Sequence, residues 1–139
     1  MKLKFAFFTW LIAILLNSIF STLYLSHDSM YAELAEWSGL LLASSVFTLL
    51  FSLPGFAGIF LWIWVADNFY FSSIKKFICF SIGCLITTLL CYVLLSSILG
   101  IPITELKFYH LMLLSMLSVL TALLVQRKYF YRIVMPDFD

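Results

Sequence analysis

Long uncharged stretches of mostly apolar residues alternate with short polar segments along this chain. A helix needs about 20 apolar residues to cross the roughly 30 Å hydrocarbon core of a bilayer. Four stretches meet this length: Phe5 to Leu25, Ser38 to Ala66, Phe77 to Leu99 and Phe108 to Val125. Because lipid offers no partner to backbone N–H and C=O groups, each stretch is expected to form a helix. The pattern predicts an all-α fold, an integral membrane bundle of four transmembrane helices that forms one domain over residues 1–139.

The second stretch is interrupted near its middle by Pro54 and Gly55, and Gly58 follows one turn later. Proline removes a backbone hydrogen bond and clashes with the preceding turn, so we expect a helix kink at this point. A re-entrant hairpin that turns at Pro54 is the competing interpretation. It would place Lys75 and Lys76 on the outer side of the membrane, against the rule that positive charge stays inside.

The distribution of Lys and Arg indicates the orientation, because positively charged loops are retained on the cytoplasmic side. With four spans, Lys107 alone of the eight basic residues falls on the outer side. The other seven are Lys2, Lys4, Lys75, Lys76, Arg127, Lys128 and Arg132. The N-terminus and the C-terminus are therefore predicted to be cytoplasmic. The short loops favour a multi-pass protein of a bacterial cell inner membrane.

Composition supports lipid as the main solvent and partner of the chain. The sequence is 64% hydrophobic and 11% charged, with a mean hydropathy of +1.10, whereas soluble domains carry about 25% charged residues. A net charge of +1 argues against a nucleic-acid partner, which would need a basic patch. The basic start followed by an apolar run has features of a secretory signal. However, the run continues to Leu25, beyond the usual core of about 7 to 15 residues, so we expect an uncleaved first helix.

Small and polar residues recur at steps of three and four within the stretches. Helices in lipid associate through small residues that let backbones approach and through polar side chains that bond across. The predicted helix-packing residues are Asn17, Ser45, Thr48, Ser52, Ser81, Cys84, Thr88, Ser115 and Ser118. The alternative is a polar lining for a solute path. Ionisable residues usually mark such paths, and the centres of the stretches contain none.

A second candidate site lies at the predicted outer surface. His27 and Asp28 follow the first stretch, Glu105 lies in the second outer loop, and His110 lies near the start of the fourth stretch. Imidazole and carboxylate ligands suit divalent transition metals such as zinc, and two histidines suit a haem b. No HExxH or other fixed spacing supports such a site. We therefore treat these four residues as solvated and expect no cofactor.

Catalytic motifs are not recognisable in this sequence, since no GxSxG elbow surrounds any serine. We expect a protein that is not an enzyme and that acts by lateral contact in the bilayer, with a membrane-protein partner or by self-association. An accessory, assembly or immunity-type subunit would fit. The first alternative is a small oligomeric transporter or channel. The small and polar residues that recur at helical spacing and the break at Pro54 support this alternative. The second is a metal- or haem-binding membrane enzyme or redox subunit that uses His27, His110 and the outer carboxylates.

Overall fold

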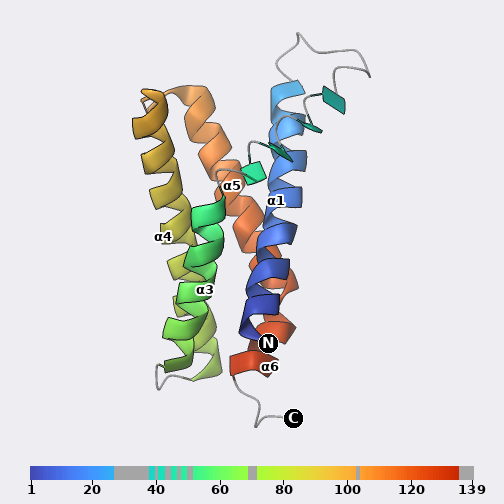
Figure 1. Ribbon diagram of the computed structural model, residues 1–139, viewed down its shortest axis with the longest axis vertical. Helices are drawn as coiled ribbons and strands as arrows, with labels where there is room; N and C mark the ends of the chain where they lie inside the picture. The colour runs from blue at the N-terminus through green and yellow to red at the C-terminus, as the bar shows by residue number, and fades with distance from the viewer. Residues whose placement is uncertain are drawn as a thin grey trace.

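The structure, a computed structural model, describes residues 1–26, 38–39, 41–42, 45–46, 48–49, 52–68, 72–102 and 104–134. Over these residues the protein is all-α (Figure 1). The described helices are α1 (Lys2–Ser26), α3 (Leu53–Asn68), α4 (Ser73–Leu99), α5 (Leu106–Val125) and α6 (Arg127–Val134). The four described pairs between residues 38 and 49 are also helical.

Three of these helices are long and apolar enough to cross a membrane, over Lys2–Leu25, Ser73–Leu99 and Leu106–Val125. They correspond to the first, third and fourth predicted stretches, whose helical state is confirmed. α1 and α4 begin a few residues earlier than the uncharged stretches, at positions next to lysines. Lysine tolerates such a place because its apolar stem lies along the helix while its ammonium group reaches the polar surface.

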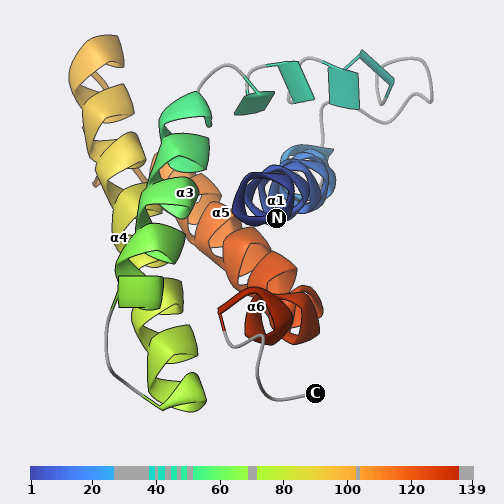
Figure 2. The ribbon, with the colours of Figure 1, turned by 60° about the horizontal axis from the view of Figure 1, so that its bottom comes forward.

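The second predicted stretch, Ser38 to Ala66, is not described as one straight helix. α3 contains 16 residues, a length of about 24 Å at 1.5 Å per residue. The helical pairs between residues 38 and 49 lead away from the axis of α3 (Figure 2). The count of four spans stays a prediction, because α3 alone is shorter than the hydrocarbon core.

The predicted kink at Pro54 stays a prediction, since residues 50 and 51 lie outside the described part of the chain. Pro54 lies in the first turn of α3, where a missing N–H costs no intrahelical bond. Around it, the Ser52 N–H donates to the Thr48 carbonyl at 2.9 Å and the Phe56 N–H donates to the Ser52 carbonyl at 3.0 Å. Helical hydrogen bonding therefore occurs on both sides of the proline.

The four long segments form a ring. α1 lies beside α3 and α5, and α4 lies beside the same two helices (Figure 1). α1 and α4 run in one direction and α3 and α5 in the other, so α1 begins where α5 ends. α6 follows Gln126 and contacts α1, α4 and α5 at that end (Figure 2). The beginning of the chain and its last described helix are thereby brought together.

Aromatic rings fill the end of the bundle that α6 covers. Phe80 of α4 and Phe130 of α6 are stacked with centroids 4.9 Å apart and an interplanar angle of 14°. The Phe5 ring of α1 lies 6.0 Å from Phe80 and 6.1 Å from Phe130. All three side chains are buried, whereas Lys128 and Arg132 on the other face of α6 are exposed. α6 is thus an amphipathic helix anchored by one phenylalanine.

Two glycines set the distance between α3 and α4. A Cβ atom on Gly83 would lie 2.1 Å from the Trp62 ring, and one on Gly58 would lie 2.2 Å from the Thr87 methyl carbon. The Trp62 indole N–H also donates to the Thr87 hydroxyl at 3.1 Å. Small residues let helices approach closely in lipid, and the Trp62–Thr87 hydrogen bond crosses this contact.

Candidate functional site

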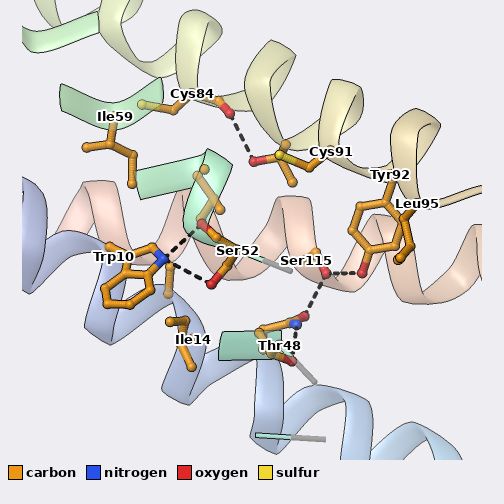
Figure 3. A pocket seen from close by; sticks show the side chains of 15 residues that line it. Trp10, Ile14, Thr48, Ser52, Ile59, Cys84, Cys91, Tyr92, Leu95 and Ser115 are labelled. Carbon is orange, nitrogen blue, oxygen red and sulfur yellow. Dashed lines mark hydrogen bonds between the residues drawn. The ribbon is translucent and has the colours of Figure 1, made fainter. Parts of the chain in front are cut away.

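Polar side chains from four helical segments form a hydrogen-bonded network inside the bundle (Figure 3). The Asn17 amide nitrogen donates to the Thr48 hydroxyl at 3.3 Å, and the Ser115 hydroxyl donates to the Asn17 amide oxygen at 2.8 Å. The Tyr92 hydroxyl is hydrogen-bonded to Ser115. A serine hydroxyl has one proton, so when Ser115 donates to Asn17 it accepts from Tyr92. The network then runs in one direction from α4 through α5 and α1 to Thr48.

A second polar contact ties α1 to the start of α3. The Trp10 indole N–H lies 3.1 Å from the Ser52 carbonyl oxygen and 3.0 Å from its hydroxyl oxygen. Both contacts come from one N–H, which is therefore shared between two acceptors. This bond holds the chain just before Pro54 against the first helix.

These polar groups border a cavity of about 110 Å³ between the helices. Its walls also include apolar side chains, of which Ile14, Ile59, Leu95 and Val119 come from four different helices. Among the residues that line it in the described part of the chain, none is Asp, Glu, Lys, Arg or His. The cavity therefore combines neutral hydrogen-bonding groups with apolar surface.

The structure brings six of the nine predicted helix-packing residues to this cavity. They are Asn17, Thr48, Ser52, Cys84, Thr88 and Ser115. The hydroxyls of Ser45, Ser81 and Ser118 instead donate to carbonyls four residues earlier in their own helices. Of the predicted kink residues, Gly55 lines the cavity, Gly58 contacts Thr87, and Pro54 is exposed.

Sequence reasoning missed two of the polar side chains that line the cavity, Trp10 and Tyr92. Trp10 is one of many aromatic residues near a helix end, and nothing in the spacing shows that its N–H meets Ser52. Tyr92 is a hydroxyl within an apolar stretch, which indicates a partner but does not identify Ser115. Both assignments depend on the rotation of each helix about its axis, which sequence periodicity leaves open.

The predicted outer-surface site is described only in part, since His27 and Asp28 lie outside the described residues. Glu105 is exposed just before α5. His110 Nδ1 lies 2.6 Å from the Leu106 carbonyl oxygen and therefore donates to it, and its ring stacks on Tyr24 with centroids 5.4 Å apart. Within the described ranges, no three His, Cys, Asp or Glu residues are grouped as metal ligands. The metal and haem hypotheses stay untested predictions.

At the opposite end of the bundle, charged groups connect elements far apart in sequence. The Lys2 ammonium forms an ion pair with the Asp67 carboxylate, which joins the start of α1 to the end of α3. Lys76 is 9% exposed, and its ammonium lies 3.5 Å from the Asp67 carbonyl oxygen. The Arg127 guanidinium lies over the Phe77 ring at 5.6 Å, a cation–π contact between α6 and α4.

Comparison with known families finds no matching family model, and comparisons with curated proteins and with solved structures find no match. The functional interpretation therefore depends on the geometry of the chain itself. Besides the ring of helices, two features are candidates for a function. One is the neutral cavity between the helices. The other is the outward-facing surface of α3 and α4 around Trp62 and Ile82.

Proposed function

We propose that this protein crosses a bacterial inner membrane four times and acts, without catalysis, by lateral contact with another membrane protein or with a second copy of itself. The second crossing combines α3 with the helical residues that precede Pro54. The role is that of an accessory, assembly or immunity-type subunit. The outward surface of α3 and α4 is the observation that carries this proposal.

An apolar groove runs along that surface. It is lined by Trp62, Lys75, Ile78, Cys79, Ile82 and Gly83. The absence of a side chain at Gly83 makes room for the Trp62 ring, which forms one wall. The groove therefore follows from the same close approach that packs α3 onto α4.

A ridge of isoleucines runs along α4 beside the groove. Its members are Ile74, Ile78, Ile82 and Ile86, which are between 45% and 60% exposed. Residues spaced by four form the ridges that fit into grooves of a neighbouring helix. Lipid tails are as apolar as these side chains, so association in a bilayer depends on how well such surfaces interlock. A ridge beside a groove is the shape that a partner helix requires.

Charge supports the proposed orientation. The helix ends that carry Lys2, Lys75 and Arg127 lie at one end of the bundle, whereas Glu105 and Lys107 lie at the other (Figure 1). Basic residues near short loops favour retention in the cytoplasm. The end covered by α6 is accordingly the cytoplasmic one in this proposal.

Site-specific photocrosslinking in native membranes tests the lateral contact. A photoreactive amino acid at Ile82 should yield a defined adduct, because Ile82 belongs to both the ridge and the groove. The same group at Leu117 of α5, which is 51% exposed, is the matched control. An adduct of twice the 16.0 kDa chain mass would identify a second copy. Equal adducts from both positions, or none from Ile82, would contradict the proposal.

A further inference from the structure

We propose that the central cavity is a binding site for a small uncharged molecule with one hydroxyl or carbonyl group and a compact apolar body. This inference concerns the inside of the bundle and does not depend on the lateral contact proposed above. It follows from the size of the cavity, from the polar group at its wall and from the absence of charge around it.

The size of the cavity limits the ligand. Its volume is about 110 Å³, and an engineered protein cavity of about 150 Å³ is known to accept benzene. A ring of about five carbon atoms with one oxygen is therefore an appropriate occupant.

Asn17 supplies the polar end of the site. A side-chain amide has two N–H groups and an oxygen with two lone pairs. One N–H goes to Thr48 and one lone pair accepts from Ser115. Within the described part of the chain, this leaves one N–H and one lone pair of an amide that lines the cavity and is 9% exposed. A hydroxyl can engage either group and a carbonyl can accept from the N–H, so the amide recognises both.

The remaining wall determines the rest of the ligand. Ile14, Ile59, Leu95 and Val119 provide apolar contact around the polar group. A charged ligand would lose its hydration without meeting an opposite charge, since the lining contains no acidic or basic side chain within the described residues. The site therefore selects a neutral molecule whose apolar body fills the space beside Asn17.

Methyl NMR of the intact protein in lipid nanodiscs tests the site, with cyclopentanol and cyclopentane as probes. The two rings have similar size, and only the first carries a hydroxyl. Cyclopentanol should shift the methyl signals of Ile14 and Ile59 saturably, whereas Ile82 and Ile98, which face outward, should shift only with the probe content of the lipid. Cyclopentane should bind about fivefold more weakly, the equivalent of one hydrogen bond.

Two variants connect the binding to the assigned residues. Asn17→Leu keeps a similar volume and should reduce the preference for cyclopentanol to less than about twofold. Thr121→Val is the matched control, because the Thr121 hydroxyl bonds to its own helix at Leu117 and does not line the cavity. It should keep the fivefold preference.

Three results would overturn the proposal. The first is an equal response of the cavity and outward methyl groups, which would mean partition into lipid. The second is equal affinity for both rings in the unmodified protein, a comparison that needs no variant to fold. The third is the absence of any saturable shift, which would mean that water or an acyl chain already fills the space.

Discussion

Asn17 shows how one polar side chain connects several helices in the interior of the bundle. Its amide donates to Thr48 and accepts from Ser115, so α1 is bonded to two neighbours at once. Ser115 in turn meets Tyr92 on α4. Unlike van der Waals contacts between apolar side chains, these bonds require one rotation of each helix about its axis.

Replacement of Asn17 by leucine should lower the free energy of unfolding by about 1 to 2 kcal/mol. Hydrogen bonds between membrane helices average about 0.6 kcal/mol each, with a maximum near 1.7, and two are lost. The loss stays moderate because the Ser115 hydroxyl can then donate its one proton to the Leu111 carbonyl, which lies 3.0 Å away. Reversible unfolding in mixed micelles measures the change. Thr121→Val is the control, and its free energy of unfolding should change by no more than about 0.5 kcal/mol. If Thr121→Val lowers the free energy of unfolding as much as Asn17→Leu does, the amide of Asn17 has no special role in stability.

At this scale the sequence identifies residue types better than partners. Asn17 was predicted as a packing residue because an amide within an apolar stretch needs a bond. Its two partners lie 31 and 98 residues away, and no local pattern carries that information. The Ser81 hydroxyl donates to the Phe77 carbonyl of its own helix, as the Thr88 hydroxyl does to the Cys84 carbonyl. The role of Ser81 in helix packing therefore stays a prediction.

At the scale of elements, glycines control how α3 meets α4. Gly83→Ala should lower the free energy of unfolding by about 1 to 3 kcal/mol, the usual cost of overpacking. The added methyl group would overlap the Trp62 ring, which is rigid and bonded to Thr87. Unfolding in mixed micelles measures the change, and tryptophan fluorescence reports the displacement of the indole.

Gly55→Ala is the matched control within the same pair of helices. A Cβ at Gly55 meets nothing within 4 Å, so the helix-forming preference of alanine should leave stability unchanged or raise it by up to about 1 kcal/mol. If Gly55→Ala destabilises as much as Gly83→Ala, the cost belongs to glycine loss in general and the close contact is not its cause.

Hydropathy predicted three helices well. It did not predict a helix too short to span the membrane, and it does not predict how each helix is rotated about its axis. α1, α4 and α5 stand out because each is a long run without charge. α6 was not predicted as a helix, because its eight residues, RKYFYRIV, are too few and too polar for a span. Its stability comes from the tertiary contact of Phe130 with Phe80. The sequence predicts a kink at Pro54, but it does not predict in which direction the described pairs between residues 38 and 49 lie.

At the scale of the whole molecule, the proposed four crossings would place both termini in the cytoplasm. Green fluorescent protein fused to either end should therefore fluoresce, and alkaline phosphatase fused to either end should be inactive. A phosphatase fusion after Pro102, between α4 and α5, should be active and provides the control. A re-entrant turn at Pro54 would instead leave three crossings and place the two termini in opposite compartments, so the two terminal reporters would disagree.

The charge pattern predicted this orientation, but it does not reveal which charges meet. Lys2 and Asp67 are separated by 65 residues and form an ion pair at the end of the bundle. Their encounter depends on the packing of α1 against α3. Long-range contacts of this kind form only when the four segments pack together. The lengths and charges of the segments do not predict which residues will pair.

The position of Phe130 has a consequence for the order of biosynthesis. Phe5 is translated well before Phe130, yet the two rings contact each other at that end of the bundle. α1 must therefore enter the bilayer and remain there with this side uncovered while the later helices are made. The packing at this end of the bundle is therefore complete only after α6 has been translated.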